Sequence, residues 1–181
     1  MFCPACGQPL PLAAPSRCTS CGRRQWKNPK PCAGALVQVD DEVLLVKRAR
    51  EPWPTHWDVP GGFCEDGEHP IETAERELSE ELGLEVVVDN YLGAWIDTYP
   101  ATLESGAART LNLYYCVRLP VRPTLVLDRS EIVLAGWFTP DRPPEPLVAH
   151  VVQVLVAYRR RLMNGSLAEV VDRPDRSRAS S

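Results

Sequence analysis

A short acidic stretch, residues 61–84, constrains the fold of this chain more than any other feature of its sequence. It reads GGFCEDGEHPIETAERELSEELGL and places eight acidic residues against a single arginine, although the whole chain has a formal net charge of only -4. Pro70 stands where a helix can begin, and Gly83 stands where a left-handed cap can end it. Apolar residues recur between them at steps of three and four, namely Ile71, Ala74, Leu78 and Leu82. The stretch therefore predicts a helix that packs inward on one face.

Three glutamates on this helix raise the question of a cation. Glu77, Glu80 and Glu81 stand at i, i+3 and i+4, so their carboxylates share one face and repel one another by about 0.2–0.5 kcal/mol per pair. Mg²⁺ and Mn²⁺ prefer oxygen ligands, and the preceding Gly61-Gly62 pair would let backbone carbonyls approach the same ions. Charge alone favours a solvated acidic face, because most runs of charge are solvated. The order of residue types favours the cation.

That order matches a known pattern at each of its fixed positions. The pattern is G-x5-E-x7-R-E-U-x-E-E-x-G-U, where U is a bulky aliphatic residue, and the matching residues are Gly62, Glu68, Arg76, Glu77, Leu78, Glu80, Glu81, Gly83 and Leu84. This pattern is the Nudix box, and the chain resembles Nudix hydrolases over roughly residues 32–163. The resemblance implies an α+β fold, an α/β/α sandwich with a mixed sheet. It also implies hydrolysis of a nucleoside diphosphate linked to another group, dependent on Mg²⁺ or Mn²⁺.

The resemblance assigns roles to the matching residues. Glu77, Glu80 and Glu81 would bind the metal ions, with the Gly62 carbonyl as a further ligand. Ions of this kind neutralise a pyrophosphate, polarise a phosphorus–oxygen bond and lower the pKa of an attacking water. Arg76 would pair with a box glutamate and orient it, as its planar guanidinium allows.

The resemblance leaves two points open. Glu68 would either support the geometry of the loop and helix or join the metal shell. The catalytic base would be a box glutamate, Glu80 or Glu81, or a glutamate in a later loop. Glu131, in DRSEIVLAGWF, stands where that later residue often occurs, and Glu104 is the second choice. A surface acid without a catalytic role is the alternative for both.

Residues 1–30 form a second unit, which is too small to bury an apolar core of its own. Cys3 and Cys6 form one C-x2-C pair, Cys18 and Cys21 form another, and a glycine follows each pair. Four thiolates fill the tetrahedral shell of Zn²⁺ and leave no open position, so we expect a structural zinc ribbon rather than disulfides or free thiols. A ribbon before a Nudix domain resembles NADH pyrophosphatases and related proteins, which favours a dinucleotide-type substrate.

The residues that select the substrate lie outside the box. NADH pyrophosphatases have an SQPWPFPxS array after the box. The corresponding segment of this chain is LGAWIDTYPATLES, which lacks that array. Its proline, Pro100, lies sixteen residues past Leu84, as in ADP-ribose-type members. The candidate substrate-binding residues are Trp57, Tyr99, Pro100 and Glu104. For an aromatic ring, packing in the core or in a loop is the alternative to stacking on a base.

These features predict cleavage of the pyrophosphate bond of an ADP-ribose- or NADH-like substrate. One alternative is a house-cleaning hydrolase of noncanonical or oxidised nucleoside triphosphates. Another is a non-catalytic nucleotide sensor whose ribbon binds a partner. The complete set of box acids argues against the sensor.

The remaining sequence predicts mixed strands and helices without a regular βαβ alternation. Strands are expected over residues 33–39, 43–49, 85–99, 111–119 and 132–139, and a second helix over residues 146–163. We assign residues 31–165 to the Nudix domain and residues 166–181 to a disordered tail.

Composition bears on partners and location. The chain has 24 acidic against 20 basic residues, which makes a nucleic-acid backbone an unlikely main ligand and favours a nucleotide-type small molecule. We expect a cytoplasmic protein without a membrane segment, because the chain has neither a signal-like start nor an apolar run of about 18 residues. The resemblance implies a homodimer. Cys32, Cys64 and Cys116 are interpreted as small buried apolar residues.

Overall fold

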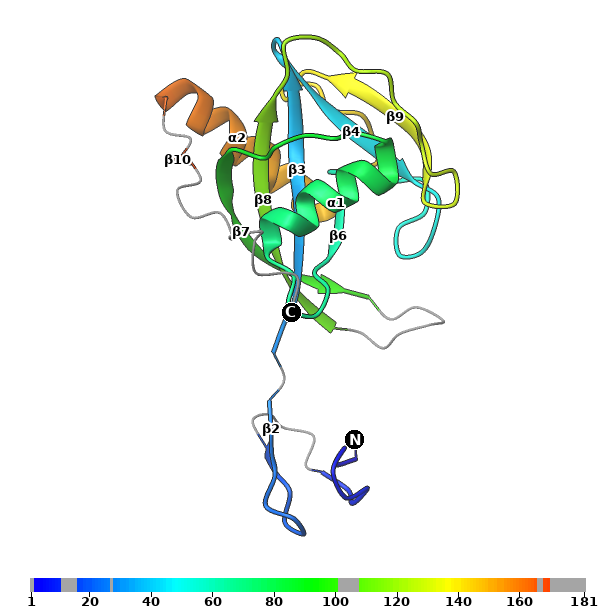
Figure 1. The fold of residues 1–181 in the computed structure, drawn as a ribbon, viewed down its shortest axis with the longest axis vertical. Coiled ribbons are helices and arrows are strands. Elements are labelled where there is room, and N and C mark those ends of the chain that lie inside the picture. Colours follow the sequence, from blue (N-terminus) through cyan, green and yellow to red (C-terminus); the bar gives the residue numbers. More distant parts are fainter. Residues whose placement is uncertain (1, 11–15, 27, 101–107, 166–167, 170–181) are drawn as a thin grey trace, which may run out of the picture.

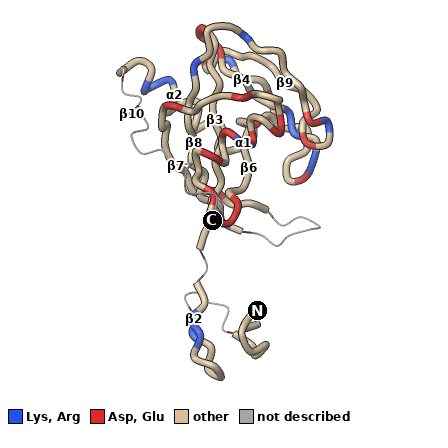
Figure 2. Tube along the Cα trace, in the orientation of Figure 1, with Lys and Arg blue, Asp and Glu red and all other residues tan. Residues whose placement is uncertain are grey.

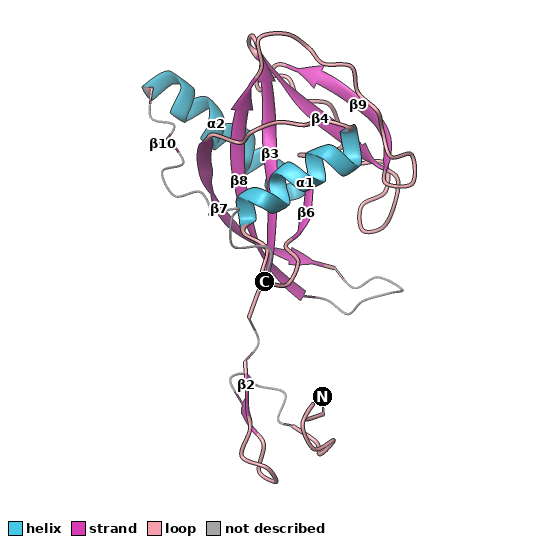
Figure 3. Cartoon of the chain, in the orientation of Figure 1, coloured by secondary structure: helices cyan, strands magenta, loops and turns pink. Residues whose placement is uncertain are grey.

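The computed structural model describes residues 2–10, 16–26, 28–100, 108–165 and 168–169. Its centre is a sheet of eight strands with a helix on each face (Figures 1 and 3). The strands are β3 (Lys30–Val39), β4 (Glu42–Arg48), β5 (Trp57–Asp58), β6 (Gly61–Phe63), β7 (Asn90–Tyr99), β8 (Ala108–Arg118), β9 (Ile132–Phe138) and β10 (Ala168–Glu169). The helices are α1 (Pro70–Leu82) and α2 (Ala149–Asn164).

Strand β3 organises the sheet. It runs parallel to β8 and antiparallel to β4 and β6. The main path through the sheet is β10-β7-β8-β3-β4-β5, with β9 paired to β4 and β6 paired to β3. All other pairings between the described strands are antiparallel. The sheet is therefore mixed, as the sequence predicts.

The two faces of the sheet bury separate hydrophobic clusters. Successive residues of a strand point to opposite faces, and on β3 this alternation places Ala35 and Val37 in one cluster and Leu36 in the other. The first cluster includes the apolar face of α1, with Ile71, Ala74, Leu78 and Leu82. The second includes Val151, Val154, Leu155 and Tyr158 of α2. Helices on both faces confirm the predicted α/β/α sandwich.

Two predicted elements begin later in the structure than the sequence predicts. Strand β7 begins at Asn90 rather than at residue 85, because the preceding segment is tied to α1: the Val88 N–H donates to Glu75 Oε1 (3.0 Å). Helix α2 begins at Ala149 rather than at residue 146. The Trp57 N–H donates to the Pro146 carbonyl (2.8 Å) and the Val148 N–H to the Trp57 carbonyl (2.9 Å). Residues 146–148 therefore run beside β5 before the helix starts.

The N-terminal unit stands apart from the sheet in Figure 1 and joins it through the start of β3. It contains a two-stranded hairpin of β1 (Ser16–Arg17) and β2 (Arg24–Gln25). At the other end of the chain, β10 pairs with β7 inside the segment predicted as a disordered tail. The rest of that tail lies outside the described residues. No helix among the described residues is long and apolar enough to cross a membrane.

Candidate active site

Local hydrogen bonds fix both ends of α1. The His69 Nδ1 atom accepts a hydrogen bond from the Ile71 N–H (3.2 Å), and the Glu72 carboxylate accepts one from the His69 N–H (3.0 Å). At the other end Gly83 has a φ of 66°, a left-handed conformation that glycine adopts without a steric penalty. The predicted start at Pro70 and the predicted cap at Gly83 are confirmed. The box glutamates therefore project from a helix with well-defined ends, along which acidic residues gather in Figure 2.

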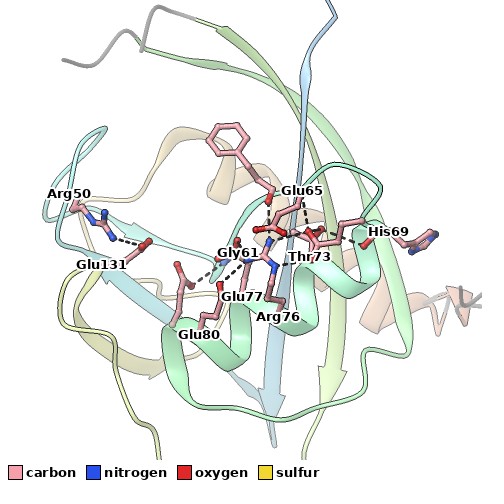
Figure 4. A network of polar contacts seen from close by, with 12 residues as sticks. Arg50, Gly61, Glu65, His69, Thr73, Arg76, Glu77, Glu80 and Glu131 are labelled. Atoms are coloured by element: carbon pink, nitrogen blue, oxygen red, sulfur yellow. Dashed lines mark hydrogen bonds and ion pairs between the residues drawn. The ribbon is translucent and has the colours of Figure 1, made fainter. Parts of the chain in front are cut away.

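Gly61 and Gly62, the first two residues of β6, pack so closely against their neighbours that neither position has room for a side chain. A Cβ atom on Gly61 would lie 2.5 Å from the Ala33 carbonyl oxygen, and one on Gly62 would lie 2.2 Å from Glu77 Oε1. The Gly61 N–H donates a hydrogen bond to Glu81 Oε2 (3.2 Å). The two glycines thus bring the backbone next to two box carboxylates (Figure 4).

Arg76 is the centre of the polar network drawn in Figure 4. Its Nε and Nη2 atoms donate to the two carboxyl oxygens of Glu68 (2.8 and 3.1 Å). Its Nη1 atom donates to Glu77 (2.9 Å) and Glu80 (2.8 Å). Its Nη2 atom also donates to the Phe63 carbonyl oxygen (3.2 Å), which ties the helix to β6. Arg76 therefore links Glu68, Glu77 and Glu80 to the backbone of β6.

Glu68 accepts two hydrogen bonds from Arg76, whereas Glu77 and Glu80 accept one each. Its Oε2 atom also accepts hydrogen bonds from the Glu65 N–H (2.9 Å) and the Thr73 hydroxyl (2.7 Å). Its hydrogen bonds to Arg76 lower the pKa of Glu68 to about 2. Glu68 thus joins the loop to the helix, which is one of the two roles that the sequence left open.

Glu81 is buried in the site, and the side chain of Glu77 is 13% exposed. Glu81 is 7% exposed, and burial, followed by the negative charges of Glu77 and Asp58, raises its pKa well above the ordinary value. Burial also raises the pKa of Glu77, although Arg76 opposes the effect. The Glu80 side chain is 60% exposed. Two carboxyl groups that ionise at a cost are suited to a bound cation, whose charge would offset that cost.

The carboxylates of Glu77, Glu80 and Glu81 line a pocket of about 440 Å³ between β6 and α1. Its lining residues are Arg48, Gly61, Gly62, Phe63, Cys64, Glu65, Arg76, Glu77, Glu80, Glu81 and Glu131. Glu131 reaches this pocket from the loop before β9 and forms an ion pair with Arg50. A larger depression of about 670 Å³ lies on the outer side of α1, but Glu77, Glu81 and the two glycines are not part of it. We therefore place the chemistry in the smaller pocket.

The donor atoms of this pocket fit a hard divalent cation. Glu77, Glu80 and Glu81 offer carboxyl oxygens and Gly62 offers its backbone, which are the ligand types that Mg²⁺ and Mn²⁺ prefer. These oxygens do not converge tightly, since among the described residues only a group of cysteines brings three or more potential ligand atoms within 4.8 Å of one another. Mg²⁺ usually keeps several waters, so tight convergence of protein oxygens is not required.

The four candidate substrate-binding residues have different surroundings in the structure. Trp57 is 6% exposed and packs edge-on against Phe138 in the core, so its ring is not part of the pocket wall. Tyr99 ends β7 and lies edge-on to Phe63, with ring centroids 5.3 Å apart. Pro100 follows it and is partly exposed. Glu104 lies outside the described residues.

The four cysteines of the N-terminal unit come together as the sequence predicts. The Sγ atoms of Cys3 and Cys21 lie 3.6 Å apart, as do those of Cys6 and Cys18. A tetrahedral zinc site with Zn–S bonds of about 2.3 Å has sulfur atoms about 3.8 Å apart, so the cluster fits zinc. The backbone N–H of Cys21 lowers the pKa of Cys18 to about 6, which favours the thiolate that a metal requires.

Each cysteine pair is folded by the same backbone turn. The Gly7 N–H donates to the Cys3 carbonyl (2.8 Å), and the Gly22 N–H donates to the Cys18 carbonyl (2.9 Å). Both glycines have a positive φ, 71° and 74°. The glycine after each pair is therefore required by the turn that holds the sulfur atoms.

Comparison with known proteins agrees with the site. A family model described as the NUDIX domain matches residues 28–157. The chain belongs to the Nudix family. Proteins similar to it include the NAD-capped RNA hydrolases NudC of Pseudomonas aeruginosa PAO1 (31% identical over 166 residues) and of Klebsiella pneumoniae strain 342 (25% identical over 167 residues). The alignments cover 87% and 88% of this chain but 56% and 61% of the relatives, so the chain spans little more than half of their length.

Solved Nudix structures share the fold. A Nudix hydrolase from Nitrosomonas europaea superposes with a TM-score of 0.69 at 22% identity, and the match covers 92% of this chain and 94% of that one. The NUDIX domain of Shewanella oneidensis NrtR, complexed with ADP ribose, superposes with a TM-score of 0.63 at 20% identity, covering 76% and 90%. At these identities the likeness shows the fold alone.

Phe63 and Arg48 are two of the pocket-lining residues that were not predicted from the sequence. Phe63 directly follows the glycine pair, and its ring is 39% exposed beside the pocket. Arg48 ends β4 and also lines the pocket. Phe63 could have been found from its place next to Gly62. Arg48 is one of several basic residues in VKRAR, and nothing in that local pattern distinguishes it.

Proposed function

We propose that this chain hydrolyses the pyrophosphate bond of a nucleoside diphosphate linked to another group, with an ADP-ribose- or NADH-like molecule as substrate. The observation that supports this proposal best is the close packing of Gly61 and Gly62 on Glu81 and Glu77 in an acid-lined pocket. Such a pocket would repel a pyrophosphate unless cations are bound in it. Mg²⁺ or Mn²⁺ is therefore part of the proposal.

We assign roles in this reaction to the box residues of the pocket. Glu77, Glu80 and Glu81 would hold the metal ions, with the Gly62 backbone beside them. The bound ions would neutralise the pyrophosphate and lower the pKa of the attacking water. Arg76 holds Glu77 and Glu80 in place through its Nη1 atom. Glu80 is the most exposed of these acids, so it can turn toward a ligand at little cost.

Glu131 is the group that we propose as the catalytic base. It lines the pocket yet stands outside the box, and its ion pair with Arg50 fixes it at the pocket edge. Glu131→Gln should therefore lower kcat by about 100-fold with little change in KM, the size expected for loss of a general base. An unchanged kcat would return the role to Glu80 or Glu81.

A dinucleotide-type substrate is supported by the pocket wall and by the relatives. Phe63 is partly exposed, and its backbone carbonyl accepts a hydrogen bond from Arg76. Its ring lies edge-on to Tyr99, so a flat base can stack on its exposed side. The relatives are named for NAD-capped RNA, and the NUDIX domain of NrtR was crystallised with ADP ribose. Both ligands contain a nucleoside diphosphate linked to another group. We include NAD-capped RNA among the substrates to test for this reason.

Product analysis across a substrate panel tests the proposal. The panel contains NADH, ADP-ribose, NAD-capped RNA, diadenosine polyphosphates and oxidised dGTP, each with Mg²⁺ or Mn²⁺ and with EDTA as the control. Release of AMP from NADH or ADP-ribose is expected. Activity on triphosphates alone would refute the dinucleotide substrate and favour a house-cleaning hydrolase. Nucleotide binding without any hydrolysis would favour the sensor.

A further inference from the structure

A buried polar cluster lies beside the active site, and none of its members has a role in the proposed reaction so far. His150, in the first turn of α2, is at its centre. Asp58 of β5, Asp97 of β7 and Tyr114 of β8 surround it, and Arg48 of β4 contacts it through Asp58. Five polar groups from five separate elements meet at this point.

His150 uses both of its ring nitrogens. Its Nδ1 atom lies 2.9 Å from Asp97 Oδ2. Its Nε2 atom lies 2.6 Å from the Tyr114 hydroxyl and 3.5 Å from Asp58 Oδ1. The His150 and Tyr114 rings are also stacked, with centroids 5.7 Å apart. These contacts hold the imidazole in one orientation.

The charges in the cluster are mutually dependent. Burial by itself would lower the pKa of His150, but its contacts with Asp58 and Asp97 outweigh burial and raise it. Burial by itself would raise the pKa of Asp58, but His150 and Arg48 outweigh burial and lower it. A histidine cation between two carboxylates is therefore the stable arrangement, and Asp58 is shared by two cations.

Asp58 connects this cluster to the pocket wall. Its Oδ2 atom accepts from Arg48 Nη1 (3.2 Å), and its Oδ1 atom accepts from the Val59 N–H (2.9 Å), three residues before Gly62. Arg48 is held from a second side, because its Nε atom donates to the Pro52 carbonyl (2.9 Å). Loss of one anchor would leave the guanidinium able to move.

Arg48 lines three adjoining hollows. It borders the active-site pocket, a hollow of about 130 Å³ that contains Glu81 and Glu131, and a hollow of about 70 Å³ that contains His150 and Phe63. Among the described residues, no acceptor bonds its Nη2 atom. The guanidinium thus borders the site where a substrate diphosphate would sit, with donor capacity left over.

We infer that His150 is a positioning residue of the active site: held in one orientation by Asp97 and Tyr114, it fixes Asp58 through their ion pair, and through Asp58 it holds Arg48 facing the diphosphate of the substrate. The inference rests on the proposed function, because it requires a nucleoside diphosphate in the pocket. His150 itself need not touch the substrate.

Variants of two helix positions test this role. His150→Gln removes the charge and leaves one side-chain donor, and it should raise KM for ADP-ribose by about 10-fold, with a smaller change in kcat, because a phosphate-binding group is misplaced. Val151→Ala is the matched control, since it removes buried apolar volume from the next residue of α2, whose side chain makes none of the polar contacts of the cluster. It should lower thermal stability and leave KM unchanged. Equal KM values for His150→Gln and wild type would overturn the inference.

A double-mutant cycle with Arg48 asks whether His150 acts through the arginine. Arg48→Ala should itself raise KM, and adding His150→Gln to it should change KM less than about 2-fold, since the group that His150 positions is already gone. Independent effects, in which the two KM changes multiply, would overturn the inference. Failure of wild-type turnover would instead refute the proposed function.

Calorimetric binding of ADP with Mn²⁺ gives the same comparison without turnover. ADP serves as the probe because it contains the diphosphate and the base without the second group. His150→Gln should weaken its binding by about 10-fold, and Val151→Ala should not change it. Equal affinity in wild type and His150→Gln, or no ADP binding by wild type, would overturn the role of His150.

Discussion

Replacing Glu68 with glutamine should separate the structural part of the Nudix box from its metal-binding part. Glu68 accepts two hydrogen bonds from Arg76 and one each from the Glu65 N–H and the Thr73 hydroxyl. Its pKa falls from 4.5 to about 2 in the folded chain, which corresponds to about 3 kcal/mol if no solvent intervenes. The side chains of Arg76 and Glu68 are 25% and 14% exposed, so we reduce the expected loss to about 1–2 kcal/mol.

The pH dependence of this loss has a definite sign. Because the pKa of Glu68 is depressed in the folded state, its contribution to stability is complete above pH 4.5 and is lost as the pH falls toward 2. Glu68→Gln should therefore be less stable than wild type at pH 7, and the gap should narrow below pH 4.5. Urea unfolding with EDTA at pH 7, 5, 4 and 3 measures the free energy of unfolding of both proteins.

Asp66→Asn is the control for general charge effects. Asp66 is an exposed acid in the same turn, so its replacement should change the free energy of unfolding by less than about 0.5 kcal/mol. The reasoning is refuted if Glu68→Gln matches Asp66→Asn at pH 7, or if the gap between Glu68→Gln and wild type does not narrow in acid.

Three further variants probe the site and the ribbon. Glu81→Gln should remove most turnover, measured by AMP release, while circular dichroism shows an intact fold; turnover near the wild-type level would contradict the metal-binding role. Gly62→Ala should lower kcat by about 100-fold or more, because its Cβ would lie 2.2 Å from Glu77 Oε1 and must displace that carboxylate. Near wild-type kinetics would show that the close approach is not needed. Cys18→Ser should release zinc from purified protein, measured by elemental analysis, whereas Cys116→Ser on β8 should retain it; a wild-type zinc content near zero would rule out the four-cysteine site.

Patterns confined to neighbouring residues predicted the ends of α1, one strand pair, the cysteine cluster and the position of the box acids. The ends of α1 follow from Pro70 and Gly83, because caps depend on a few adjacent residues. The strand pair β3 and β4 follows from two apolar runs around a polar turn. The cysteine cluster follows from two C-x2-C pairs, each folded by its own glycine turn. The box acids follow from fixed spacing along one helix.

Other features depend on which distant segments meet. Trp57 seemed available for stacking in a loop rich in proline, but pairing of β5 with β4 and contact with residues 146–148 bury it in the core. The segment before β7 looked like a strand, but Val88 bonds to Glu75 of α1 and the strand begins only at Asn90. In both places a long-range contact overrides a local preference.

The family pattern, the helix that bears it and the cysteine unit can each be predicted from the sequence, because each is a relation between residues close in the chain. The contacts of His150 of α2 with Asp58 of β5 and Asp97 of β7, and the common pocket of Arg48 and Glu131, depend on how distant segments fold together. A buried charge is stable only where folding supplies its partners, and those partners come from segments that have no common local pattern.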